Sequence, residues 1–493
     1  MTCQPGDLPT TLVASANIGR GVPMPLSPPR AGSAGSVAAS LLLVTFLRDR
    51  PTSIDLPAPH PSACPGLLRI VQALDGGICR VKLAGGVLGS AQARAIADAA
   101  EHCASGVLEL TNRSNLQIRG VRAERQAELI ERLLGAGLGP QHADADDVRN
   151  LLLSPAAGLD PHALLDTRPL ACALLELLQH TPALHGLSAK FALQLDGGEA
   201  LAMLEHPHDI WLSALPGSPS RLAFGLAGCP GDMALATVNL EQAPVLIEQL
   251  LRLFLDLAGN EHSRMRQLLA VMPASQLLQQ LQARLPFSVQ TAPSDWQRAP
   301  LSQHAPIGIY PQRQAGLCMV AAAARLGRVD AAQLRALADL AEHQGDASLR
   351  LTPWQGLLLP NIPLHVAADT LQALDDLHLL TDANQPLSQL IACTGSAACG
   401  KGLADSKADA LRLAERLGAG NARPQVHISA CPRSCAAAHI APFTLLADAS
   451  GHYQLYRRTP EAAGFGQLQA ARMTIDEAGD WFAAHCATGN RNA

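Results

Sequence analysis

The chain has 493 residues, of which 48% are hydrophobic and 16% charged, so it is long enough to bury several cores and to form two or more domains. Its formal net charge is -5, from 37 Lys and Arg against 42 Asp and Glu, without a long basic run. These values do not indicate a nucleic-acid-binding surface, and we expect no nucleic-acid partner. An anionic ligand must be met by local arginines.

The N-terminal residues 1–60 are rich in Pro, Gly and Ser and contain one apolar segment, VAASLLLVTFL. This segment is too short to span a bilayer, and no A-x-A-like signal cleavage site follows it. We therefore expect a disordered extension rather than a signal peptide. The cysteines stand mostly alone in apolar stretches, which is typical of a reducing compartment and predicts a cytoplasmic protein with no membrane partner.

The chain contains an internal repeat. Residues 97–111 read ADAAEHCASGVLELT, and residues 338–352 read ADLAEHQGDASLRLT. In both copies an alternating apolar run, an Ala/Leu helix, two short strands around a turn and a second helix follow one another, which is a ferredoxin-like pattern. We predict half-repeats over 61–149 and 306–385 that pair about a pseudo-twofold axis.

A longer segment follows each half-repeat, over 150–285 and 386–493, and the Pro-rich residues 286–305 predict a linker between the halves. The expected fold class is α+β, with two ferredoxin-like half-repeats and two α/β domains related by the same pseudo-twofold symmetry.

The two copies differ in their polar residues. The first reads LTNRSNLQIRG over 110–120, where Arg113, Asn115, Gln117 and Arg119 alternate and should project from one face of a strand. The second reads LTPWQGLLLPN over 351–361, with Trp354 opposite Arg113, either to stack on a ligand or to fill the core. This contrast predicts one ligand site, built mainly by the first copy.

Four cysteines form two close pairs near the C-terminus, Cys393 with Cys399 and Cys431 with Cys435. Four thiolates from two Gly- and Ala-rich loops are what a 4Fe-4S cluster requires. Zinc sites usually have two to four residues within each pair, and spacings of five and three fit zinc poorly. Structural thiols are the remaining alternative. The loop that contains Cys399 also matches the phosphate-loop pattern G-x-x-x-x-G-K, from Gly395 to Lys401. However, Gly402 stands where a phosphate loop has a Ser or Thr hydroxyl.

The paired cysteines, the doubled half-units and LTNRSNLQIRG together resemble the nitrite and sulfite reductase superfamily over residues 62–450. Within it, ACPGLLRIV, RNLLLSPAAGLDPHALLDTRPLA, AKFALQLDGGE, HPHDIWLSA and RLTPWQGLLLP resemble the precorrin-3B synthase family most closely. The resemblance implies two nitrite/sulfite-reductase-type α/β domains and a cleft for a flat tetrapyrrole between the halves.

The resemblance also implies roles for single residues. Arg113, Arg149 and Lys190 match arginine and lysine positions that meet tetrapyrrole or oxyanion charges, with Asn115, Gln117 and Arg119 beside them. Cys435 matches the cysteine that bridges the cluster to sirohaem iron. Ala192 stands where the reductases have a second lysine, and this loss of charge favours the synthase over an oxyanion reductase.

The expected reaction is therefore hydroxylation of precorrin-3A by dioxygen to precorrin-3B, with γ-lactone formation and with NADH, directly or through a reductase, as electron donor. A sirohaem-dependent nitrite or sulfite reductase is the alternative, and a non-catalytic tetrapyrrole carrier or electron-transfer protein is a second one.

Oxygen activation needs an iron with an open position, which a cluster with four cysteine ligands lacks. Glu205, His206, His208 and Asp209 in EHPHD are the ligand types of a mononuclear non-haem iron. A solvated polar turn is the competing interpretation of the same residues.

Overall fold

The computed structural model describes residues 64–293, 296–300, 306–420, 422–459, 462 and 464–486. The N-terminal extension predicted over 1–60 lies outside the described residues. Within the described ranges, no helix is long and apolar enough to cross a membrane.

The first half-domain is a five-stranded sheet in the order β1-β2-β5-β4-β14. Its own strands are β1 (Val71–Ala73), β2 (Gly76–Val81), β4 (Val107–Leu110) and β5 (Leu116–Val121), and its helices are α1 (Ser90–Cys103) and α2 (Gln126–Gly135). The second half-domain repeats this plan in the order β12-β13-β16-β15-β3. It contains β12 (Gly308–Pro311), β13 (Leu317–Ala323), β15 (Ser348–Leu351), β16 (Gly356–Pro363), α7 (Ala331–Gln344) and α8 (Ala367–Asp376).

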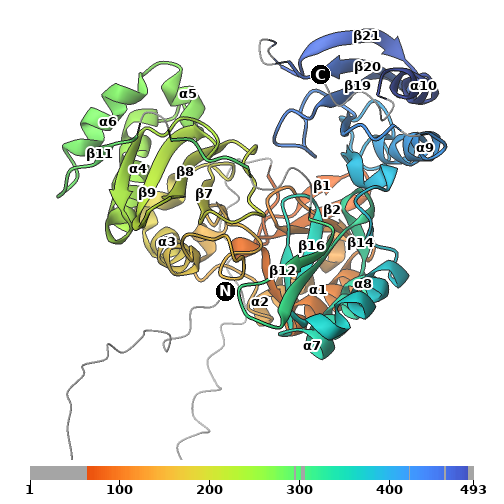
Figure 1. Cartoon of the computed structure of the whole chain (residues 1–493), viewed down its shortest axis with the longest axis horizontal. Helices are drawn as coiled ribbons and strands as arrows, with labels where there is room; N and C mark the ends of the chain where they lie inside the picture. The colour runs from red at the N-terminus through yellow and green to blue at the C-terminus, as the bar shows by residue number, and fades with distance from the viewer. Residues whose placement is uncertain are drawn as a thin grey trace, which may run out of the picture. The chain divides into compact units, whose positions relative to one another are not determined.

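The two half-domains exchange their edge strands. Strand β14 (Arg328–Asp330) of the second copy pairs with β4, and β3 (Val87–Gly89) of the first copy pairs with β15, both antiparallel. Helices α1 and α7 pack side by side, and residues of both copies share one hydrophobic core. In Figure 1 the four helices α1, α2, α7 and α8 lie together at the lower side of the half-domain pair. The exchange confirms the predicted ferredoxin-like repeat and its pseudo-twofold relation.

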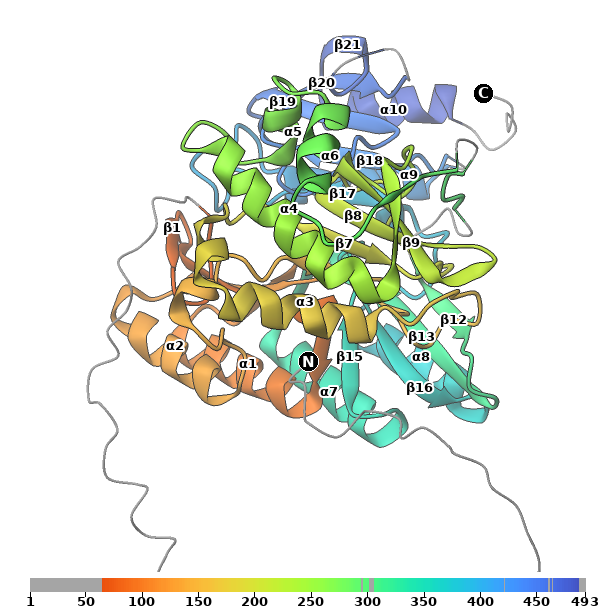
Figure 2. The same cartoon turned by 90° about the vertical axis from the view of Figure 1, so that its left-hand side faces the viewer.

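The segment after the first half-domain forms a six-stranded sheet in the order β11-β10-β9-β8-β7-β6. The strands are β6 (Leu151–Leu152), β7 (Leu193–Asp196), β8 (His208–Leu215), β9 (Ser218–Gly228), β10 (Ala236–Asn239) and β11 (Gln290–Thr291). The helices are α3 (Arg168–His180), α4 (Ala243–Ala258), α5 (Met265–Leu269) and α6 (Ala274–Gln282). Figure 2 shows α3 and α4 in front of this sheet, where their apolar faces join its core.

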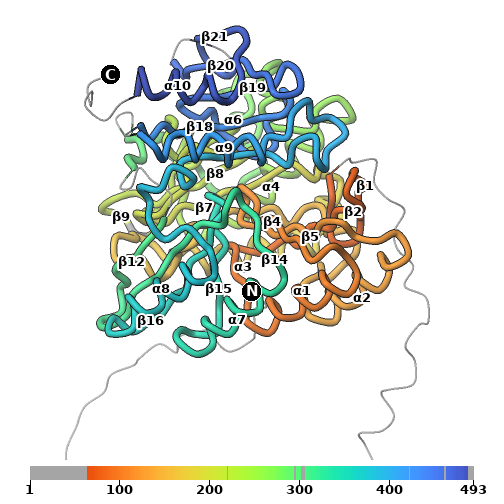
Figure 3. Tube along the Cα trace, turned by 90° about the vertical axis from the view of Figure 1, so that its right-hand side faces the viewer, coloured from red at the N-terminus to blue at the C-terminus, as the bar shows by residue number. Residues whose placement is uncertain are grey.

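The C-terminal segment repeats the same topology in a five-stranded sheet, β17-β18-β19-β20-β21. The strands are β17 (Leu390–Ala392), β18 (Val426–Ser429), β19 (Phe443–Ala449), β20 (His452–Arg457) and β21 (Gln467–Met473), with α9 (Ser406–Gly418) and α10 (Ile475–His485). Strands β6, β7 and β8 are parallel, as are β17, β18 and β19, and antiparallel strands follow from β9 and β20. Helices α9 and α10 pack together (Figure 3). The predicted pair of α/β domains is thus confirmed.

Candidate active site

The first cysteine loop starts where β17 ends and folds back tightly on itself. The backbone N–H of Cys399 donates to Gly395 O at 2.9 Å, and that of Ser396 donates to Ala404 O at 2.8 Å. Gly395 has a φ of +74°, and a Cβ at Gly402 would lie 2.7 Å from the Gly395 carbonyl carbon. The glycines are therefore needed for the close approach of the backbone around Cys393 and Cys399.

The second cysteine loop lies directly against the first. Leu403 N donates to Ala430 O at 2.9 Å, and Ala430 N donates to the Cys393 sulfur at 3.3 Å. Burial raises the pKa of the Cys435 thiol, and the nearby Cys431, Cys393 and Cys399 raise it further. The thiols of all four cysteines therefore lie close to one another.

A cubane cluster binds each sulfur through a different iron, whereas a single ion needs its ligands at one point. Among the described residues, no three His, Cys, Asp or Glu side chains form such a single-ion group. Four thiols from two interlocked loops thus fit the donor set of a 4Fe-4S cluster better than that of zinc.

A cavity with about 560 Å³ of empty space adjoins Cys393 and Cys435. It is lined by Arg80, Asn112, Gln117 and Lys407 among others. Arg80 on β2 lies opposite Gln117 on β5, and with the Gln117 amide oxygen turned toward it, Arg80 donates from Nη2 at 2.7 Å and from Nε at 3.2 Å. Burial lowers the pKa of Arg80. Sequence reasoning missed Arg80, although its strand alternation and facing register were the available signal.

A second, smaller cavity of about 240 Å³, the cation cavity, brings together three of the predicted site residues, Arg113, Asn115 and Arg149. Burial, together with the charges of Arg264 and Arg80, lowers the pKa of Arg113 to about 10. The Arg113 guanidinium makes no hydrogen bond with another described residue. The Arg149 Nε is likewise buried without a partner, while its Nη2 reaches Asp146 Oδ1 at 3.4 Å. Two guanidiniums with unused donors are suited to a small anion.

The other predicted site residues have different surroundings. Arg119 donates two 2.8 Å hydrogen bonds to Asp75 and one of 3.4 Å to Glu109, so its guanidinium is used within the fold. Lys190 is exposed and lines neither cavity. Asn115 accepts from Leu83 N at 2.9 Å and so also fixes the turn after β2.

The four residues of EHPHD do not converge. The Asp209 carboxylate accepts from Arg264 Nε at 3.0 Å, from Ala192 N at 2.9 Å and from Met265 N at 2.8 Å. His206 Nε2 lies 3.0 Å from His439 Nδ1, and the exposed Glu205 pairs with Arg458 at 3.2 Å. These contacts, and the absence of a metal-binding group among the described residues, leave the predicted mononuclear iron without a ligand set here.

Family models match more than half of the chain and identify the class of protein. Residues 71–136 and 310–377 match the nitrite/sulfite reductase ferredoxin-like half domain, and residues 144–289 match the nitrite and sulphite reductase 4Fe-4S domain. The four predicted cluster cysteines lie outside these matched residues. The structure of Mycobacterium tuberculosis NirA protein superposes with a TM-score of 0.69 at 24% identity, covering 84% of this chain and 82% of that one.

Curated relatives narrow the assignment. The chloroplastic ferredoxin–nitrite reductase of Zea mays is 31% identical over 399 residues, which cover 73% of this chain and 68% of the maize enzyme. The spinach enzyme is 29% identical, with 73% and 65% covered, and that of Synechococcus elongatus is 28% identical, with 75% and 76% covered. The chain thus spans about two thirds of the length of the plant enzymes. It belongs to the nitrite and sulfite reductase family, and it is an oxidoreductase.

These relatives overturn the predicted monooxygenase. Proteins similar over three quarters of the chain are named ferredoxin–nitrite reductases, so the assignment to precorrin-3B synthesis, with precorrin-3A, dioxygen and NADH as partners, is wrong. The error came from giving five short segments and one missing charge, at Ala192, more weight than the motifs shared by the whole superfamily.

Proposed function

We propose that this protein is a nitrite reductase that receives electrons from a ferredoxin-type donor. The observation that carries the proposal is the cation cavity, in which Arg113 and Arg149 have guanidinium donors that no carboxylate among the described residues saturates. The names of the relatives supply the substrate and donor class. A cytoplasmic location belongs to the same proposal, on the evidence of the isolated cysteines.

The charge of the cavity favours nitrite over sulfite. Nitrite carries a single negative charge, whereas sulfite carries up to two, and each uncompensated charge in a water-poor site is costly. Ala192 lines the cavity where a further lysine would add a third cation. Two arginines without this lysine are better matched to the monoanion.

The predicted prosthetic groups are a 4Fe-4S cluster held by Cys393, Cys399, Cys431 and Cys435, and a sirohaem beside Cys435. When bound, they would supply the electron path and the iron that binds nitrite. Arg80 and Gln117 line the cavity next to Cys435 and are suited to hold a carboxylate of the macrocycle.

The protein's own contribution is then electrostatic. Arg113 and Arg149 line the cation cavity together with Asn115 and Ala192. Because both guanidiniums are largely buried, water screens their charges only weakly. There they orient the anion and stabilise negative charge that develops on its oxygens. His208 also lines this cavity, but burial lowers its pKa to about 3, so it is neutral at working pH.

The test uses the full chain purified under anaerobic conditions. We expect the Soret and red absorption bands of sirohaem, and ammonium formation from nitrite with reduced ferredoxin. Arg149→Ala should lower kcat/KM for nitrite by roughly 100-fold, Arg149→Lys should restore part of it, and Arg284→Ala, which removes only an exposed ion pair with Asp256, should change nothing. Absence of the bands together with absence of nitrite turnover would refute the proposal, and a higher kcat/KM for sulfite would replace nitrite as substrate.

A further inference from the structure

The second half of the molecule contains a cavity at the position that corresponds to the cation cavity. In the first half the lining comes from the loop after β4, the start of β6 and the residue before β7; in the second half it comes from the loop after β15, the start of β17 and the residue before β18. The corresponding positions are Arg113 and Trp354, Arg149 and Ser388, Asn150 and Gln389, and Ala192 and Gln425. We call the second space the second-copy cavity.

The second-copy cavity has lost both cations of its counterpart, because Trp354 and Ser388 replace the two arginines. The charged residue in its lining is Glu205, which is exposed and already paired with Arg458. Burial lowers the pKa of both His206 and His439, so this pair is neutral at working pH. Leucine, isoleucine, valine, alanine and proline side chains make up most of the rest. The lining therefore has no excess charge to attract an anion or a cation.

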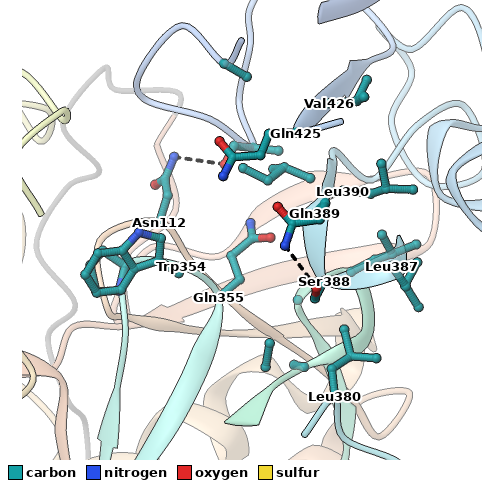
Figure 4. A pocket seen from close by; sticks show the side chains of 18 of the residues that line it. Asn112, Trp354, Gln355, Leu380, Leu387, Ser388, Gln389, Leu390, Gln425 and Val426 are labelled. Carbon is teal, nitrogen blue, oxygen red and sulfur yellow. Dashed lines mark hydrogen bonds between the residues drawn. The ribbon is translucent and has the colours of Figure 1, made fainter. Parts of the chain in front are cut away.

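The polar groups that remain are amides and one indole. Figure 4 shows Trp354, Gln355, Gln389 and Gln425 around a common space, with the amide groups of Gln355 and Gln389 turned toward one another. The Trp354 indole and the side-chain amides of Gln355 and Gln425 form no hydrogen bond with any other described residue. The Gln389 amide nitrogen donates to Ala383 O at 2.9 Å and to Ser388 Oγ at 3.3 Å, and its oxygen accepts from no other described residue. Such groups suit the edge of a ring that both donates and accepts.

We propose that the second-copy cavity binds an uncharged, flat heteroaromatic molecule, which stacks on Trp354 and exchanges hydrogen bonds with the glutamine amides. The cavity has about 970 Å³ of empty space, which includes its opening to solvent. The indole supplies a flat apolar face for stacking, and the amides fix the ring edge. The proposal goes beyond nitrite reduction and requires neither the cluster nor sirohaem.

The test is equilibrium dialysis of the full chain against riboflavin and against adenosine, two uncharged flat ring systems with amide or amidine edges. We expect at least one to bind, and we expect Trp354→Ala to weaken it about tenfold or more while Trp354→Phe retains most of the affinity. Gln389→Leu should also weaken binding, and Arg113→Ala, in the cation cavity, should not. Circular dichroism and thermal midpoints of the variants verify that they are folded.

Charge selectivity gives an independent readout. A flat tetra-anion, pyrene tetrasulfonate, should not displace the bound probe, because no Lys or Arg is among the described residues that line the second-copy cavity. The proposal is overturned if neither probe binds at millimolar concentration, if Trp354→Ala and Gln389→Leu leave the affinity unchanged, or if the tetra-anion competes.

Discussion

The buried carboxylate of Asp209 provides a sharp test of the site's construction. Its side chain is 1% exposed and pairs with Arg264, itself 15% exposed, while also accepting from the backbone N–H groups of Ala192 and Met265. Asp209→Ala would leave a largely buried guanidinium without its counter-charge, and two backbone donors without an acceptor. Removing one partner of a buried pair costs about 3–5 kcal/mol, so the free energy of unfolding should fall by that amount.

The assay is urea unfolding of Asp209→Ala beside Asp256→Ala. Asp256 pairs with Arg284 at 2.6 Å but is 60% exposed, so its loss should cost no more than about 1 kcal/mol. A lower midpoint at unchanged slope measures the stability change. Iron per folded chain should be unaffected by Asp209→Ala, because this carboxylate serves Arg264 rather than a metal. Equal midpoints for the two variants, or loss of iron in the folded Asp209 variant, would refute the reasoning.

Three further predictions concern the cysteine loops and one buried lysine. Cys431→Ser should lower iron and acid-labile sulfide per chain, whereas Cys229→Ser should leave both unchanged; equal metal content in the two variants contradicts the ligand assignment. Gly402→Ala should have a similar effect, because its Cβ would lie 2.7 Å from the Gly395 carbonyl carbon and from Ser396 N, while Gly418→Ala meets nothing within 4 Å and serves as the matched control for sulfide analysis. Burial lowers the pKa of Lys82 from its ordinary 10.5 to about 7. The unfolded chain therefore binds more protons between these values, and the free energy of unfolding of the wild type should rise with pH across this window relative to Lys82→Met, as urea midpoints at several pH values would show.

The repeat and the architecture could be predicted from the sequence because both depend on local periodicity. The Ala/Leu pattern of each half-repeat and the alternating apolar strands recur in recognisable order. The exchange of β3 and β14 could not be predicted in this way, since each is three residues long and pairs with a strand more than 200 residues away in sequence. The predicted domain boundaries stay predictions, although the sheets begin and end near them.

Single site residues were harder to predict than the fold, for a reason visible at Arg119. Its alternation with Arg113 and Gln117 indicates a shared face, but whether a guanidinium is free depends on acidic partners elsewhere in the chain. Asp75 lies 44 residues away and accepts two hydrogen bonds from Arg119, and Glu109 accepts a third. The partners of Arg113 cannot be predicted from sequence spacing either. Only the fold shows that no described residue forms a hydrogen bond with its guanidinium.

In the proposed site, one half of the duplicated fold would supply the cations and the other half the cysteines. Asn112, which precedes Arg113 in the first half-domain, donates to the backbone carbonyl of Ala436 at 3.3 Å and to that of Cys435 at 3.5 Å. The loop that carries the cation is thereby fixed against the loop that carries the last cysteine, across 323 residues of sequence. Because the pseudo-twofold arrangement creates two such places, the cations are needed at only one. The other, with Trp354 and its amides, was free to acquire a neutral lining, and the same Asn112 borders it.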